Sequence, residues 1–285
     1  SFSKMKKFID SFINVWKIEE LKNRILLTLG LLLVYRFGAQ VTLPGIDATK
    51  LTNLTNQTDE GIGWLINVFT GGAFSQASVF ALGIMPYISA SIVVQLMGIA
   101  VPYLQKLQKD GESGRKKINQ ITRWLTILIT LVQGPGYIYN LYRTLPGEAF
   151  MLTGPTFIYS SVLILVTGTI FAMWLGEKIT EKGIGNGISM LIMIGIISRF
   201  PGAIIAEGLE KGSSGLLLLI IEAVVLFFVV VGVIALTEAT RRIPVQYAKQ
   251  VVGGKVYGGQ RQYIPIKVNA SGVMPIIFAQ SLMFV

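Results

Sequence analysis

The sequence has no histidine and no cysteine, and only 14% of its 285 residues are charged. Without these side chains it cannot form a Ser–His or Cys–His nucleophile, an imidazole or thiolate metal site, or a disulfide. We therefore expect no catalytic residue, no cofactor and no metal, and a protein that is not an enzyme. The charged fraction is also well below the roughly 25% of an average soluble domain.

Apolar residues take the place of the missing charge. They make up 52% of the chain, and the mean hydropathy is +0.61. Long apolar runs occupy 25–43, 77–101, 124–141, 157–175, 188–205, 216–236 and the stretch from about 273 onward. Most approach the ~20 residues that cross a bilayer core. The sequence predicts an all-α integral membrane protein with about seven spans. The last run is still apolar at Val285 and the first residue is not Met, so we expect a fragment of a longer chain.

The basic residues alternate between the loops that join these runs. Twenty of the 25 precede the first run or lie between runs two and three, four and five, or six and seven. Lys and Arg concentrate on the cytoplasmic side of membrane proteins. This pattern predicts a cytoplasmic N-terminus.

A short motif occurs twice. Gly83–Ile88 reads GIMPYI and Gly272–Ile277 reads GVMPII, and each copy opens an apolar run. Gly and Pro at such positions are typical of broken helices in proteins built from inverted repeats. The repeat predicts two related halves with a pathway between them. We place the first half at 1–206 and the start of the second at 207–285.

Two segments outside the runs are predicted to lie at the membrane. In residues 2–16, apolar side chains recur at helical spacing among lysines, which predicts an amphipathic helix on the inner surface. Residues 62–75 are apolar but short, and Gly71–Gly72 interrupts them. They suit either an outer interfacial helix or a re-entrant segment that enters a protein-lined cavity.

A third segment, 239–270, is rich in basic residues. It has six of them and no acidic residue after position 238, and Gly253–Gly254 suits a two-residue hairpin turn. The charges could serve topology alone. A projecting basic hairpin also suits docking on a phosphate backbone or an acidic protein surface.

Several long motifs resemble those of the bacterial SecY family, the channel subunits of the Sec protein translocon. They are Phe69–Ser91, Gly111–Lys117, Thr167–Thr169, Met173–Glu177, Gly183–Ser189 and Lys267–Pro275. The similarity runs in order along nearly the whole chain. It implies a family fold of ten spans in two inverted five-span halves. This chain would hold the first five, the sixth and part of the seventh.

The resemblance implies a channel for translocation of secretory proteins and lateral insertion of membrane proteins. Five isoleucines would form an apolar pore ring, which resists hydration yet opens around a passing chain: Ile84, Ile88, Ile188, Ile192 and Ile277. Residues 62–75 would be a plug, with its key positions at Asn67, Val68, Phe69, Thr70, Gly71, Gly72, Ala73 and Phe74. A lateral gate would use Pro86, Ser89, Gln95, Gln133 and Pro275.

The resemblance also implies partners and a location in the bacterial inner membrane. The partners would be SecE and SecG subunits, the SecA motor, the ribosome with its RNA and proteins, signal sequences, nascent chains and the lipid bilayer. Cytosolic docking would use Arg115, Lys116, Lys117, Arg241, Arg242, Lys249, Lys255 and Arg261. Many bacterial relatives carry two adjacent basic residues at the hairpin tip, whereas this chain has Gly254–Lys255.

Other classes of membrane protein fit the sequence less well than a channel. A small-solute secondary transporter also uses inverted repeats. It would normally need polar groups at the midplane, where this chain offers mainly Gln95 and Gln133. A purely structural membrane subunit leaves the basic hairpin unexplained. An intramembrane protease lacks both a His and a pair of Asp residues within the runs.

Overall fold

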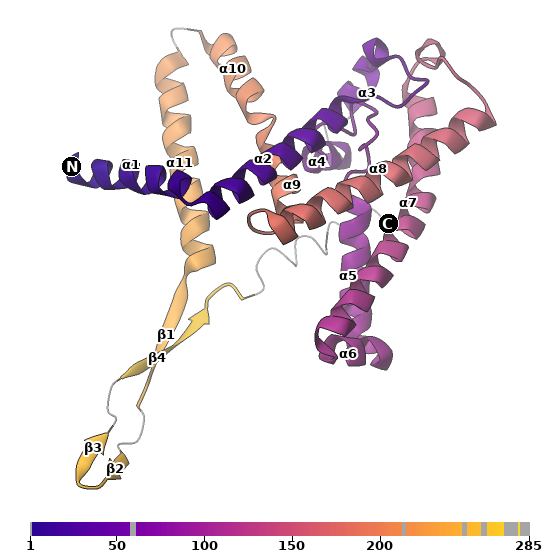
Figure 1. Cartoon of the computed structure of the whole chain (residues 1–285). Helices are drawn as coiled ribbons and strands as arrows, with labels where there is room; N and C mark the ends of the chain where they lie inside the picture. The colour runs from indigo at the N-terminus through magenta and orange to yellow at the C-terminus, as the bar shows by residue number, and fades with distance from the viewer. Residues whose placement is uncertain are drawn as a thin grey trace. The chain divides into compact units, whose positions relative to one another are not determined.

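The structure, a computed structural model, is mostly helical and separates into two compact units, Ser1–Gly202 and Ala203–Val285 (Figure 1). It describes residues 2–57, 61–212, 215–246, 250–257, 261–270 and 279. The predicted halves, 1–206 and 207–285, stay a prediction, because compactness by itself does not reveal an internal repeat.

The first unit is built from helices of very different length. They are α1 (Phe2–Lys17), α2 (Glu19–Gln40), α3 (Thr52–Gln57), α4 (Gly61–Phe69), α5 (Met85–Ala100), α6 (Pro102–Lys109), α7 (Gly111–Thr144), α8 (Pro155–Lys182) and α9 (Gly187–Ile197). Two 3₁₀ turns, η1 (Ala48–Lys50) and η2 (Gly147–Ala149), lie in its loops, and α10 (Phe200–Lys211) crosses into the second unit. The predicted helix at 2–16 is confirmed as α1, with Phe8, Phe12 and Trp16 exposed.

Fewer helices qualify as membrane spans than the sequence predicts. Within the described residues, α8, the continuous stretch Gly187–Lys211 and α11 (Leu216–Glu238) are each long and apolar enough. The pair α5 and α6 qualifies only together, with a 101° bend between them. The chain is thus a multi-pass membrane protein, with three to four candidate spans in its described part. The predicted total of seven is not confirmed, and the run from 273 lies outside the described residues apart from position 279.

The second span was predicted at 77–101, and the predicted start was wrong. Its helix begins at Met85, and residues 70–84 form consecutive turns. Pro86 lies in the first helical turn, where the missing N–H of proline costs nothing. Gly83 just before it has φ of +55°, a conformation that ends regular helix for most residues. Apolar side chains of 77–84 are instead buried against neighbouring helices.

Two apolar clusters form the core of the first unit. The α7–loop cluster joins α7 and α8 to the loops before α3 and α5 through buried Leu43, Leu54, Ala77, Ile138, Leu141 and Phe157. The α2–α9 cluster joins α2, the turns before α5, α8 and α9 through buried Leu32, Tyr35, Ala73, Ile84, Leu175 and Leu191. The turns at 70–84 contribute to both clusters, which fixes their path.

Backbone hydrogen bonds tie these loops together where no helix can satisfy them. The Leu43 N–H donates to the Ala77 carbonyl over 2.8 Å, and the Asp47 N–H donates to the Ala149 carbonyl over 2.8 Å. The Thr49 hydroxyl and backbone N–H both donate to the Asp47 carboxylate, which lowers the pKa of that carboxyl. Paired polar groups of this kind are the condition for burying irregular backbone.

The second unit contains α11 and a two-tier antiparallel ribbon. Its strands are β1 (Thr240–Val245), β2 (Gln250–Val252), β3 (Lys255–Tyr257) and β4 (Gln262–Lys267). β1 pairs with β4, and β2 pairs with β3. Gly253 and Gly254, with φ of +62° and +80°, form the predicted two-residue turn, so the hairpin is confirmed. Lys211 at the end of α10 contacts Glu207 on its own helix and Glu222 on α11, so Glu222 is paired.

Candidate functional site

The candidate plug, residues 62–75, consists of most of α4 and the first turns that follow it. The Asn67 side-chain oxygen accepts a hydrogen bond from the Ser75 N–H over 3.2 Å, and the Thr70 hydroxyl donates to the Ile66 carbonyl over 2.9 Å. Gly71 and Gly72 have φ of +64° and +86°, which L side chains rarely adopt. The segment therefore closes on itself as a compact unit, with its sharpest bend at the predicted Gly–Gly break.

Three other helices contact the candidate plug. An Arg36 Nη1 on α2 donates to the Gly71 carbonyl over 2.8 Å, and the Tyr137 hydroxyl on α7 donates to the Phe74 carbonyl over 2.8 Å. Gly71 also lies against Gly195 of α9, where a Cβ on Gly71 would come within 2.7 Å of the Gly195 Cα. Sequence reasoning missed all three of these contacts. No local signal in the sequence marks the residues that make them.

Three of the predicted ring isoleucines meet beside the plug. Ile84 is buried in the α2–α9 cluster, which also contains plug residue Ala73, and Ile88 and Ile188 pack against it. Ile192, on α9, is half-buried. Ile277 lies outside the described residues. The arrangement brings one end of α5 and one end of α9 onto the same apolar surface as the plug.

The turn from α8 into α9 fixes where Ile188 lies. The Asn186 side-chain oxygen caps α9 by accepting from the Ile188 and Ser189 N–H groups. The Thr180 hydroxyl accepts from the Gly187 N–H over 2.8 Å. A Cβ on Gly187 would overlap the backbone of Gly176, so only glycine permits this close approach of α8 and α9. Gly185 within this turn has φ of +67°.

The predicted gate residues lie on two packed helices. Pro86 and Ser89 are buried on α5, Gln95 of α5 is exposed, and Gln133 is half-buried on α7. α5 packs along α7. Pro275 lies outside the described residues. The polar pair Gln95 and Gln133 is therefore at the surface of the first unit rather than in its core.

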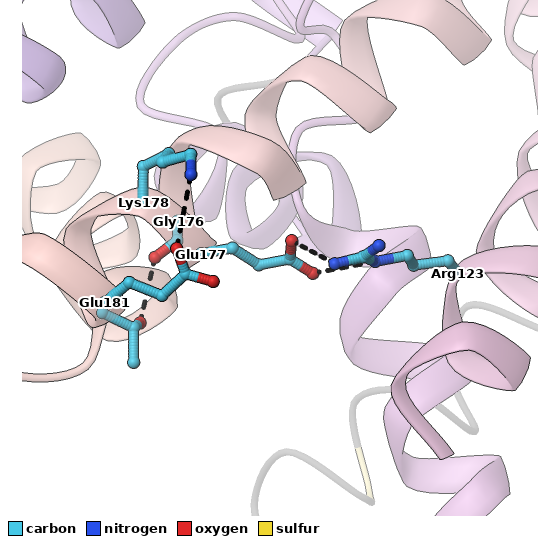
Figure 2. A network of polar contacts seen from close by, with 6 residues as sticks. Arg123, Gly176, Glu177, Lys178 and Glu181 are labelled. Carbon is cyan, nitrogen blue, oxygen red and sulfur yellow. Dashed lines mark hydrogen bonds and ion pairs between the residues drawn. The ribbon is translucent and has the colours of Figure 1, made fainter. Parts of the chain in front are cut away.

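An ion pair joins α7 to α8 (Figure 2). The Arg123 guanidinium donates to both carboxylate oxygens of Glu177, over 3.1 Å from Nε and 2.6 Å from Nη2. The two side chains are 48% and 25% exposed. Next to Glu177 on α8, the Lys178 ammonium pairs with Glu181 over 3.3 Å. A two-pronged contact of the Arg123–Glu177 kind holds two helices in one register more firmly than a single-pronged one.

The predicted docking residues lie on two surfaces. Arg115, Lys116 and Lys117 are exposed near the start of α7, and Lys116 pairs with Glu112 one turn earlier. Arg241 and Arg242 are exposed on β1, and Arg261 is exposed next to β4. Lys255 begins β3, while Lys249 lies outside the described residues. Among the described residues, no group of three acidic side chains is placed to hold a metal ion.

Comparison with known proteins gives one consistent result. The sequence model of the SecY family matches residues 78–285. The chain is 46% identical to the protein translocase subunit SecY of Escherichia coli K12 over 268 residues, which cover 92% of this chain and 60% of that protein. It is also 46% identical to the SecY subunit of a Buchnera aphidicola strain, of which it covers 75%.

Solved structures share the fold at lower sequence identity. One is described as a protein-conducting channel, with a TM-score of 0.55 and 20% identity. Another is the idle yeast Ssh1 complex bound to the yeast 80S ribosome, with a TM-score of 0.61 and 18% identity. In both, the match covers 92% of this chain and 56% of the solved chain.

Proposed function

The chain belongs to the SecY family, and on that premise we propose that the protein containing it is a protein-conducting channel. Secretory polypeptides would cross the membrane through it, and membrane proteins would leave it sideways into the lipid. The chain spans about 60% of the length of the Escherichia coli relative, and the proposal concerns the whole protein.

The observation that carries this proposal is the packing of the candidate plug, residues 62–75, against three of the predicted ring isoleucines. Ala73 shares one apolar cluster with Ile84, Ile88 and Ile188. A short segment that enters the proposed pore from one side and packs on an apolar ring could block that pore. Its turns contribute apolar contacts and few charges, so it can leave and return without stranding buried ions.

The pore would be sealed by the ring of Ile84, Ile88, Ile188, Ile192 and Ile277. A narrow apolar constriction excludes water and ions because it offers them no hydrogen-bond partner. It also offers no fixed partner to a passing polypeptide, so chains of any sequence can slide through. Residues 67–74 would block this constriction from the outer side as a re-entrant plug.

The lateral gate would open between α5 and the seventh span. Pro86, Ser89, Gln95, Gln133 and Pro275 are its proposed residues on these spans and on α7. Polar groups along the line between two gate helices make a poor contact with lipid hydrocarbon. A hydrophobic signal sequence that enters between the helices would therefore separate them readily. The Gly-x-Met-Pro motifs at the starts of both gate helices fit an inverted repeat of five-span halves, 1–206 and the part from 207 onward.

The proposed location is the bacterial inner membrane with the N-terminus in the cytoplasm. Two solved homologous structures are ribosome-bound channel complexes, Sec61 from canine endoplasmic reticulum and yeast Ssh1. We propose the ribosome and the SecA motor as partners of the basic loops at 102–123 and 239–270. SecE and SecG would be the membrane partners, and signal sequences and nascent chains the transported ones.

Deletion of residues 64–74 in the full-length complex tests this function. The expected result is an intact complex that conducts ions at rest in planar bilayers and transports substrates with defective signal sequences. Replacing the exposed Trp64 by Ala is the matched control, because it changes the same segment without removing it. An ion-tight deletion variant, or one that no longer assembles, would mean that the segment is structural and not a plug.

A further inference from the structure

One charged side chain reaches the sharpest bend of the plug. Arg36 lies near the end of α2, next to Tyr35, which is only 1% exposed. Its guanidinium is half-buried and donates over 2.8 Å to the Gly71 carbonyl. Hydrogen bonds from a charged donor are stronger than those between neutral groups. This contact is therefore the strongest polar tie between α2 and the plug in the described part of the chain.

Gly71, which accepts this hydrogen bond, also lies close to the backbone of α9. A Cβ on Gly71 would lie 2.6 Å from the Arg36 guanidinium and 2.7 Å from the Gly195 Cα. A Cβ on Gly195 would lie 3.3 Å from the Gly71 Cα. Gly71 thus sits in a slot between an arginine and the backbone of α9. A Cβ at position 71 would not fit there, and a Cβ at position 195 would make a tight contact. Its neighbour Gly72 has the same kind of φ but open space around it.

The plug also carries a group that works against staying closed. The Asn67 side chain is fully buried, and its Nδ2 has no hydrogen-bond partner among the described residues. A buried donor without a partner destabilises the state that buries it. The unpaired Asn67 amide destabilises the closed position, so the Arg36–Gly71 hydrogen bond contributes a large part of the net free energy that favours it.

We propose that Arg36 is a positioning residue that latches the plug shut through the Gly71 carbonyl, with the Gly71–Gly195 slot as the catch. The inference rests on the proposed plug function of residues 62–75. The half-exposed guanidinium can exchange the carbonyl for water, which makes the latch reversible. Opening then requires the loss of this hydrogen bond and of the one from Tyr137 to the Phe74 carbonyl, and the withdrawal of Gly71 from the slot.

The test uses the full-length complex in proteoliposomes with a thiol reporter in the plug. The chain has no cysteine, so Ala73→Cys gives a single reactive thiol in this region, buried while the plug is closed. Arg36→Gln removes the charged donor, and Arg36→Lys keeps a charge without the planar fork. Arg199→Gln is the matched control, because Arg199 is exposed near the end of α9 and takes part in no hydrogen bond within the described residues.

Arg36→Gln is expected to raise both the rate of maleimide labelling at position 73 and the resting ion leak by about tenfold. Arg36→Lys should fall between Gln and the parent, and Arg199→Gln should match the parent. Gly195→Ala, which narrows the catch without touching the donor, should raise both signals in an independent way. If Arg36→Gln does not assemble, the Gly195→Ala result decides.

The outcomes separate the latch from the plug. Unchanged labelling in Arg36→Gln, together with a leak in the 64–74 deletion, would overturn the latch and leave the plug standing. If the deletion itself stays ion-tight, the proposed function fails and the latch with it. Equal leaks in Arg36→Gln and Arg199→Gln would show a general loss of positive charge rather than a latch.

Discussion

The Arg123–Glu177 pair between α7 and α8 allows a quantitative test of how the first unit keeps its register. Its two hydrogen bonds, of 3.1 and 2.6 Å, have the two-pronged geometry that makes arginine–carboxylate contacts strong. The change is the replacement of each partner by Gln, singly and together. Gln keeps the approximate shape of Glu177 and removes only its charge.

The expected coupling free energy of the pair follows from how exposed its two side chains are. Fully exposed pairs contribute about 0.2–1 kcal/mol, whereas breaking a buried pair costs about 3–5 kcal/mol. Arg123 is 48% exposed and Glu177 only 25%. Water screens the arginine side, so we expect a coupling free energy of about 1.5 kcal/mol. For a unit of this size, that corresponds to a fall of about 3–6 °C in the unfolding midpoint.

The assay is thermal unfolding of the detergent-solubilised full-length complex at low and high salt. Each single variant should lower the midpoint, and the double variant should be no worse than the singles, because the second change removes no further contact. Lys178→Gln with Glu181→Gln is the matched control on the same helix, a single-pronged pair three residues apart whose side chains are 34% and 61% exposed. It should shift the midpoint by less than about 1–2 °C.

Strictly additive single changes would refute this reasoning, because additivity means that the two charges do not interact in the folded state. A shift no larger than that of the Lys178–Glu181 control would also refute it. Both results would mean that apolar packing alone sets the register of α7 and α8. High salt should shrink the Arg123–Glu177 effect only in part, because Glu177 is mostly shielded from solvent.

Three further outcomes are expected. Replacing Ile88 and Ile192 by Ser should hydrate the ring and raise resting ion leak in bilayers, and conductance equal to the parent would remove both from the seal. Reversing Arg241 and Arg242 to Glu should weaken co-sedimentation with ribosomes or motor at low salt and less so at high salt, because screening over ~8 Å already weakens the parent contact; unchanged binding at low salt would leave these charges a role in topology alone. Removing the cap with Asn186→Ala should destabilise the start of α9 by about 1 kcal/mol, whereas Asn186→Asp, which keeps the acceptor, should not, as thermal unfolding would show; equal midpoints for the two would mean that the cap contributes nothing.

Much of the chain's architecture could be predicted from local sequence. The Gly253–Gly254 pair needs positive φ and gives a two-residue hairpin turn, so the tip of the ribbon could be predicted without knowing its surroundings. Asn186 precedes an apolar run and caps α9, and asparagine is among the residue types that local sequence favours at such a position. The family motifs identified the chain because they are long and occur in order. In each case the information lies within a few neighbouring residues.

Only the tertiary structure decided which residues contact the candidate plug and where the helix of the second predicted span begins. Arg36 and Gly71 are 35 residues apart in sequence, and Arg123 and Glu177 are 54 apart. The apolar run from 77 was predicted to be helical throughout, but residues 77–84 turn between two apolar clusters and the helix starts at Met85. The physical reason is that hydropathy measures only how unfavourable water is for a side chain. It is the same for a residue that faces lipid, packs in a core or lines a pore, and the choice among these is made by partners that are distant in the sequence.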